Sequence, residues 1–337
     1  MIKKYIYFTL ITIFALQTYG CELFDNDQNT DELFYLDDNG ITIRCPDAEP
    51  GDTGYVGDTQ YKAVDLKLLK LHVGKEADVT QFCTSLITNM SHIFDGAASF
   101  NQDIGSWDVS NVMYMESMFR NANSFNQDIG KWDVSNVRAM NQMFARANTF
   151  NQDIGSWDVN SVQNMHGMFM HTSDFNKNIG NWNVSNVNNM RSMFESADSF
   201  NQDIGEWDVS SVSSMVFMFK NAGSFNQDIS NWDIGNVEHI VSMFHGAVSF
   251  NQDIGDWNTS NISNMNELFH LAVSFNQDIG DWDVSNVIHM DEMFRGAVDF
   301  NQDLTGWCVE YIDSKPDHFA LVSALSEENK PEWGTCP

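Results

Sequence analysis

The sequence predicts a repeat solenoid, and two observations predict it. The stretch FNQDIGSWDVSNVMYMESMFRNANS, residues 100–124, recurs without a gap at a period of 25 residues, so Phe followed by Asn returns nine times from Phe100 to Phe300. A Trp stands seven residues after each of these Phe residues, from Trp107 to Trp307. A fixed period between about 20 and 50 residues is typical of stacked repeats, in which each unit contacts only its neighbours.

The apolar spacing changes within each repeat. Trp107 and Val109 flank Asp108, so they share one face of a short strand while Asp108 points the other way. After Val112 the apolar residues take helical spacing, i, i+3, i+4 and i+7, at Met115, Met118, Phe119 and Ala122. We therefore expect one short parallel β-strand plus a short helix per 25-residue repeat, joined by right-handed crossovers.

Capping modules are expected at both ends, because a terminal repeat turns one face to water. Residues 41–45 alternate like a strand, residues 55–64 have the pattern of a hairpin, and Asp65 can cap a short helix, 66–73, that Gly74 ends. The expected divisions are a signal peptide at 1–20, an acidic tether at 21–39, an N-terminal capping module at 40–78, the solenoid of 25-residue repeats at 79–312 and a C-terminal cap at 313–337.

Residues 1–20 have the pattern of a secretory signal. Lys3 and Lys4 precede an apolar run, residues 5–16, that is too short to span a bilayer well. Cys21 follows at once. Two interpretations stay open: Cys21 is incidental after an ordinary cleavage, or it is the acylated first residue of a bacterial lipoprotein, whose signal this segment resembles.

The cysteine count favours lipidation of Cys21. The chain has five cysteines, and an odd number in a secreted protein leaves one unpaired. The other four lie as two before the repeats and two after them. Nearest-in-chain pairing then predicts the disulfides Cys45–Cys83 and Cys308–Cys336, each stapling an end module in an oxidising compartment. Free buried thiols are the alternative.

The charge of the chain restricts its partners. Formal net charge is −30 at pH 7, and a strongly acidic surface repels nucleic acid and anionic lipid. We therefore expect no nucleic-acid partner, and membrane contact only through a lipid anchor. The acidity suits cations, basic patches on partners or simple solubility.

Two apolar ladders invite a chemical interpretation and a structural one. Fourteen of the 18 methionines fall in two series that start at Met115 and Met118, and Met-x-x-Met can hold Cu(I). Ile240 and Leu268 replace methionine in these series and bind no metal, which favours core packing. The tryptophans could stack sugars, but their alternation with polar residues places them in the core.

Polar residues also form columns, meaning sets of residues 25 apart. An unbroken column from Asn101 to Asn301 suits a buried amide ladder or a turn. His245 and His270 should neighbour each other at exposed helix positions, and two ligands alone make a weak metal site. The outward aspartates invite Ca²⁺, with a hydrated acidic face as the alternative; they are Asp108, Asp133, Asp158, Asp208, Asp233 and Asp283, interrupted by Asn183 and Asn258.

The variable positions cluster in and just after the expected helix. Most basic residues of the repeats lie there, so we expect two chemically different faces, one of which a partner would use. We find no nucleophile with its base and no phosphate loop, and we expect no catalysis and no resident cofactor beyond Ca²⁺. The variable residues are Arg138, His166, Arg191, Phe217, Glu267 and Asp291, then Arg120, Arg146, Glu195, Lys220, His245 and Arg295.

The repeat resembles a known family over roughly residues 80–312. The phrase FNQDIGxWDVSNVxxMxxMFxxA resembles the repeat of BspA-like bacterial surface proteins, and Ile104-x-x-Trp107-x-Val109-x-x-Val112 is similar to the leucine-rich-repeat consensus. The resemblance implies an exported, surface-attached protein of a family often discussed as adhesins.

Two functional hypotheses follow. The first is an outer-membrane lipoprotein that faces the cell surface and binds a protein or glycan on another cell or matrix. The second is a structural envelope or matrix protein whose acidic columns bind divalent cations.

Overall fold

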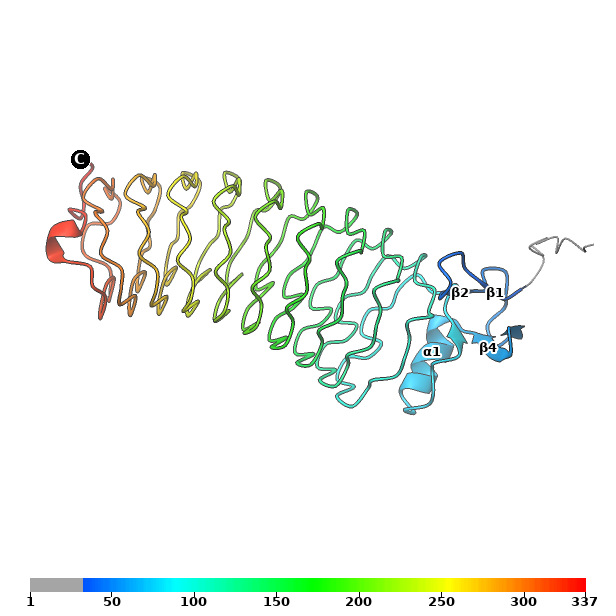
Figure 1. Ribbon diagram of the computed structural model, residues 1–337. Coiled ribbons are helices and arrows are strands. Elements are labelled where there is room, and N and C mark those ends of the chain that lie inside the picture. The colour runs from blue at the N-terminus through cyan, green and yellow to red at the C-terminus, as the bar shows by residue number, and fades with distance from the viewer. Residues whose placement is uncertain (1–32) are drawn as a thin grey trace, which may run out of the picture. The chain divides into compact units, whose positions relative to one another are not determined.

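The computed structural model describes residues 33–337, in which a stack of coils follows an N-terminal module (Figure 1). Each coil is one 25-residue repeat. The described regular elements are β1 (Tyr35–Leu36), β2 (Ile43–Arg44), β3 (Thr53–Val56), β4 (Thr59–Ala63), α1 (Leu66–Val73), β5 (Phe82–Cys83) and the 3-10 helix η1 (Glu327–Asn329). β1 pairs with β2 and β3 with β4, both antiparallel, and β5 joins β4 in parallel.

The N-terminal module confirms the expected hairpin and helix. β3 and β4 are joined through Gly57 and Asp58. Asp65 precedes α1 and accepts a hydrogen bond from the Leu68 N–H at 2.7 Å, which satisfies one of the free donors at a helix start. Leu69 is fully buried, and Gly74 ends the helix.

The module is larger than the expected range of 40–78. Residues 33–39, assigned to the acidic tether, are folded: β1 lies there, and Phe34 is only 2% exposed. The module also continues to β5, whose Cys83 is bonded to Cys45. The acidic composition of residues 33–39 gave no sign that they are folded, because one buried aromatic residue and a two-residue strand are enough to hold this segment in the module. The rest of the expected tether, and the expected signal peptide, lie outside the described residues.

The repeats differ from the expected strand plus helix, because the structure has no regular helix or strand between β5 and η1. The expected strand at Trp107–Val109 is not formed. Neighbouring coils instead meet in single parallel bridges later in the repeat, such as Tyr114 with Ala139. The expected helix, 115–122, is a run of turns, which we call the turn run of each coil.

Hydrogen bonding explains why the turn run is not a helix. Some of its N–H groups donate three residues back, as Met118 does to the Met115 carbonyl and Ala122 to the Phe119 carbonyl. The donors between them reach the next coil, Met115 to Ala139, Ser117 to Asn141, Phe119 to Met143 and Asn121 to Ala145. A helix would use these same donors for its own bonds to residue i−4, so the two arrangements exclude each other.

Two backbone positions in each turn run have left-handed conformation. Ser117 has φ of +53° and Asn121 of +60°, and both columns repeat this sign through the stack. Positive φ at the third residue is the geometry of a type II turn. A left-handed residue at every fourth position prevents a continuous right-handed helix. The apolar residues between these positions still have the spacing that a helix would require.

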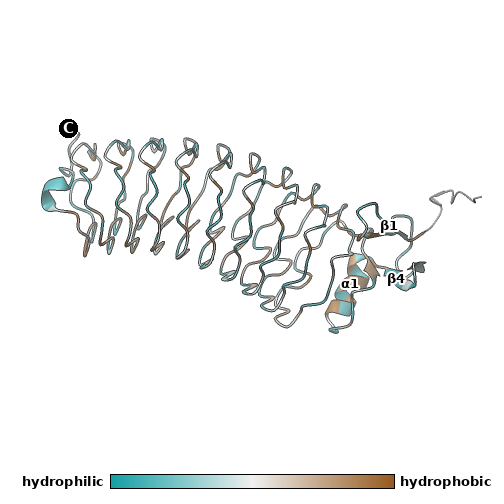
Figure 2. Cartoon of the chain, viewed as in Figure 1, coloured by the Kyte–Doolittle hydropathy of each residue, from teal (hydrophilic) through white to brown (hydrophobic). Residues whose placement is uncertain are grey.

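The core is a set of apolar columns that runs through the stack. The Met115, Met118 and Phe119 columns are fully buried. Phe119 stacks on Phe144 of the next coil with ring centroids 5.6 Å apart, and on Phe125, the residue that begins the next repeat, at 3.9 Å. Apolar and polar residues alternate around every coil (Figure 2), so the predicted periodic core is confirmed even though the elements differ.

The C-terminal cap follows the path of one more coil. The Phe294 N–H donates to the Phe319 carbonyl at 2.7 Å, and the Leu304 N–H to the Asn329 carbonyl at 2.9 Å. Phe319 turns its edge to Phe294, at an interplanar angle of 85°, which ends the stacked ladder. Cys308 and Cys336 form the second disulfide, so both bonds join the pairs expected from the sequence.

Candidate functional site

The candidate site is the variable side of the turn runs, where side chains range from buried, as Ser117 is at 2% exposure, to exposed, as Arg191 is. We call the surface formed by the columns of Glu116, Ser117 and Arg120 the turn face. Its side chains differ from coil to coil, whereas the columns on either side are nearly constant. Backbone bonds to the neighbouring coil hold each turn run in place, so these variable side chains project from a fixed lattice.

The methionine and tryptophan ladders do not contribute to this site. All methionines of both ladders are fully buried. Each indole is at most 4% exposed, and its Nε1–H donates to a carbonyl of the preceding coil, as from Trp132 to Ile104 at 3.2 Å. The core interpretation of both ladders is therefore confirmed, since a ring this buried offers no face to a sugar.

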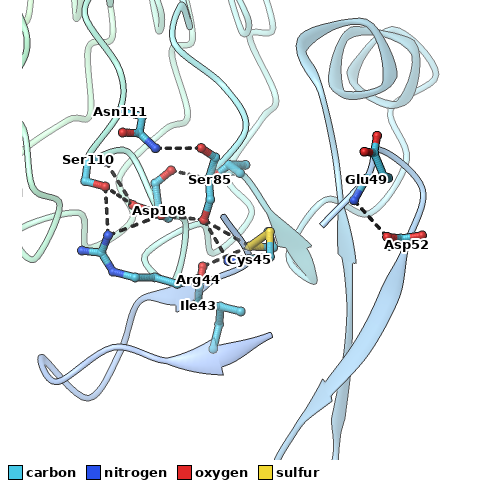
Figure 3. The surroundings of a disulfide bond; sticks show 11 residues. Ile43, Arg44, Cys45, Glu49, Asp52, Ser85, Asp108, Ser110 and Asn111 are labelled. Atoms are coloured by element: carbon cyan, nitrogen blue, oxygen red, sulfur yellow. Dashed lines mark hydrogen bonds and ion pairs between the residues drawn. A yellow bond between two sulfur atoms is a disulfide. The ribbon is translucent and has the colours of Figure 1, made fainter. Parts of the chain in front are cut away.

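The expected outward aspartate column has one exception. Asp133 and its counterparts in later coils are exposed, but Asp108 is 3% exposed beneath the N-terminal module. It accepts a hydrogen bond from the Ser85 Oγ at 2.5 Å and lies 3.7 Å from Arg44 Nη1 (Figure 3). The first coil differs because the module covers it.

The exposed aspartates stabilise turns. Asp208 accepts hydrogen bonds from both the hydroxyl and the N–H of Ser210, and these bonds lower the pKa of that carboxyl. The Asp103 column does the same, with its Oδ1 accepting the Gly105 N–H at 3.0 Å. These side chains are thus engaged within their own coils.

The asparagine column forms a ladder at the coil surface. The Oδ1 of Asn101 accepts the N–H of Asn126 at 2.9 Å, and the same bond recurs along the stack to Asn301, whose Oδ1 accepts the Ser326 N–H. In most coils a glutamine adds a second donor, as Gln127 does to Asn101, whereas Lys177 stands at this position in one coil. An amide ladder is therefore present, but it lies at the surface and is not buried as expected.

Ion pairs hold several turn-face residues. The Arg120 guanidinium donates to both carboxylate oxygens of Asp95, at 2.9 Å and 2.5 Å, and this bond lowers the pKa of Asp95. Arg295 donates to Glu292 at 3.0 Å. The basic residues of this face therefore alternate with acids, and the face is mixed in charge rather than uniformly basic.

Arg191 and Lys220 are placed differently. They lie over the ring of Phe217, with Cζ of Arg191 4.9 Å and Nζ of Lys220 4.8 Å from its centroid. Phe217 has φ of +60°. It is the one hydrophobic residue in a column of small and polar residues, His92, Ser117, Gln142, Gly167, Ser192, Ser242, Glu267 and Glu292.

His245 and His270 do meet on neighbouring coils, as expected, with ring centroids 4.3 Å apart. They are mostly buried, at 16% and 13% exposure, so the expected exposed positions were wrong. Glu267 lies between them, its Oε2 2.9 Å from His245 Nδ1 and 3.9 Å from His270 Nδ1. Sequence reasoning missed this third member, although its offsets of 22 and 3 residues from the histidines recur in the Arg120 and Arg295 clusters.

Cys21, the expected lipid-attachment residue, lies outside the described residues. Among residues 33–337, no helix is both long and apolar enough to cross a membrane.

Comparison with known proteins gives one result. The model of a family described as "Mycoplasma protein of unknown function, DUF285" matches three overlapping stretches, residues 67–179, 151–247 and 227–333. Neither the curated proteins nor the solved structures contain a significant match. The three stretches together cover 67–333, well over half of the 337 residues, and the chain therefore belongs to this DUF285 repeat family.

Proposed function

We propose that this protein is an exported, lipid-anchored cell-surface protein that binds a macromolecular partner through its turn face. The signal pattern, the position of Cys21 and the resemblance to BspA-like surface proteins support export and anchoring in the outer membrane, facing outward. The partner is a protein or glycan on another cell or matrix. Coils held together by backbone bonds, with variable and partly exposed side chains on one side, support binding rather than catalysis.

The conformation of Phe217 is the observation that carries the binding proposal. A bulky residue at positive φ is a genuine outlier that costs on the order of 1–3 kcal/mol, and a backbone constraint of this kind is typical of functional positions. Serine or glycine serves the same turn in other coils. A half-buried aromatic ring beside two cations is the composition of an interface hot spot.

The charges around Phe217 indicate the chemistry of the partner. Arg191 is exposed, and both it and Lys220 lie within 5 Å of the ring centroid. A carboxylate, sulfate or other anionic group on the partner could accept hydrogen bonds from these cations while its apolar part contacts the ring. The net charge of −30 on the whole chain would repel anionic partners that approach anywhere else.

Surface exposure is tested by protease shaving of intact cells, beside a Cys21→Ala version. We expect shaving to remove the protein and the variant to appear in the medium. Survival of the protein until the envelope is opened would contradict an outward-facing role.

Binding is tested with substitutions that other coils already contain. Phe217→Ser with Lys220→Ala copies Ser192 and Ala145, and Tyr114→Ala, which copies Ala139, is the matched control. We expect the double variant to lose retention on anionic glycans or matrix proteins, measured by surface plasmon resonance, and the control to keep it. Equal retention of all three chains would contradict a role for Phe217.

The alternative, a structural envelope or matrix protein, is favoured by the exposed aspartate column. Like charges on neighbouring coils repel, and a divalent cation would relieve that repulsion. A rise in melting temperature with Ca²⁺, together with no retention on any partner, would favour this function over adhesion.

A further inference from the structure

The side chains around His245 and His270 are of the types that bind metal ions, and they lie close together. One ligand atom from each of His245, Glu267 and His270 can be chosen so that all three lie within 4.8 Å of one another. Glu292 follows on the next coil, with its Oε2 3.5 Å from His270 Nδ1. The residues come from three consecutive coils, so the stacking of the repeats brings them together.

We propose that His245, Glu267 and His270 form a binding site for a divalent transition-metal ion of the Zn²⁺ class. This function is separate from partner binding through Phe217. Imidazole nitrogen and carboxylate oxygen are zinc ligands with bonds of about 2.0–2.2 Å. In a tetrahedral site such ligands lie about 3.3 Å apart, and the observed separations from Glu267 Oε2 are 2.9 Å and 3.9 Å. These two separations lie on either side of the tetrahedral value.

The His270 imidazole has a ring nitrogen that is available to bind a metal ion. His270 Nδ1 is buried and has no hydrogen-bond partner among the described residues, although a buried polar atom is normally satisfied. An ion would satisfy the orphaned nitrogen.

Glu292 supports the site from the next coil. Arg295 donates to its Oε2 at 3.0 Å, and His318 Nδ1 lies 3.7 Å from Oε1. These neighbours hold the Glu292 carboxylate beside His270 Nδ1, on the side where the ion would lie, so Glu292 is placed to act as a further ligand. With three ligands from His245, Glu267 and His270, the fourth position is open to Glu292 or to water.

The other coils help to show that this cluster is unusual. The His245 column holds arginine, alanine, methionine, glutamate or lysine in earlier coils: Arg120, Ala145, Met170, Glu195 and Lys220. At the comparable pair near the N-terminal end, Asp95 is occupied by the Arg120 guanidinium. The carboxylate of Asp95 is thus paired with a guanidinium, whereas that of Glu267 lies beside two imidazoles.

The experiment titrates the whole chain with ZnCl₂ by calorimetry, in excess Ca²⁺ so that the exposed aspartates are occupied. Co²⁺ absorption gives an independent view of the ligand set. The variants His245→Ala, His270→Ala and Glu267→Ser copy residues found in the same columns, Ala145 and Ser192. His239→Ala, which copies Ala139, is the matched control because His239 is exposed and lies in another column.

We expect one Zn²⁺ site per chain, weakened at least about tenfold by each ligand variant and unchanged by His239→Ala. The proposal would be overturned if the chain bound no Zn²⁺ in the presence of excess Ca²⁺. It would also be overturned if the ligand variants bound Zn²⁺ as tightly as the parent. If a variant fails to fold, anomalous diffraction from the parent protein grown with zinc decides. A peak between the two rings supports the site, and peaks on the exposed aspartates alone contradict it.

Discussion

The N-terminal module and the repeat coils satisfy their backbone hydrogen bonds in opposite ways. In the module, the β3–β4 hairpin and α1 use partners that are close in sequence. In the coils, donors such as Ser117 N–H cross to a carbonyl 24 residues later, that of Asn141. The hairpin and α1 can therefore hold their local structure by themselves, whereas a coil depends on the next coil. The same dependence is what fixes the exposed turn-face columns in register.

The largest test of this contrast removes one ring from the stacked ladder. Phe169 is fully buried and stacks on Phe144 and Phe194. We expect Phe169→Ala to lower the free energy of unfolding by about 3–5 kcal/mol, because the cavity touches two neighbouring coils. Denaturant unfolding with hydrogen exchange locates the effect. Increased exchange confined to the substituted coil would contradict the dependence between neighbours.

The second test loosens the module alone. Cys45 and Cys83 close a loop with a sequence separation of 38, and replacing both by serine should cost about 2–4 kcal/mol, mainly by freeing the unfolded chain. We expect exchange to rise in β2 and β5 and to stay unchanged in coils beyond residue 150. A loss of protection that spreads through the whole stack would show that the module and the coils unfold as one unit.

The third and smallest test uses the Arg120–Asp95 pair, which links two adjacent turn runs. Arg120→Ala should cost about 0.5–1 kcal/mol, as is usual for partly exposed pairs. The pKa of Asp95 is lowered by its bond to Arg120, from an ordinary value of 3.8. The stabilisation is therefore present above that value and lost as pH falls through the lowered pKa.

The parent and Arg120→Ala should thus differ in melting temperature at pH 6, and the difference should shrink as pH falls below 3.8. Glu116→Ala, in a neighbouring column, serves as the control. A difference that persists at low pH would mean that packing of the arginine stem, not its charge, accounts for the loss.

Sequence periodicity predicted the core but not the backbone around it. Met115, Met118 and Phe119 have helical spacing. A run of consecutive turns brings residues three and four apart to the same side, as a helix does, and so buries the same side chains. The positive φ at Ser117 and Asn121 carries no clear signal, because neither residue requires that conformation. What decides between the two structures is a set of bonds to the next coil, which no single repeat reveals.

The same limit applies to the candidate sites. The period placed His245 beside His270 correctly, because it depends only on stacking. The position of Glu267 between them depends on how the turn run aims its side chains, and the strain at Phe217 depends on its φ. Both features became visible only with the turn geometry, whereas the end disulfides needed only the order of the cysteines.

The most direct test of the turn geometry compares glycine with alanine at Ser192, where φ is +54°. In a turn with positive φ, we expect Ser192→Gly to be more stable than Ser192→Ala by about 1 kcal/mol. In α1, exposed Leu71 is the matched site, and there Leu71→Gly should be less stable than Leu71→Ala by about the same amount. Opposite signs at the two sites, measured by denaturant unfolding, are the result predicted here. If the alanine variant were the more stable one at both sites, the turn run would be a helix, and the assignment of residues to the turn face would be wrong.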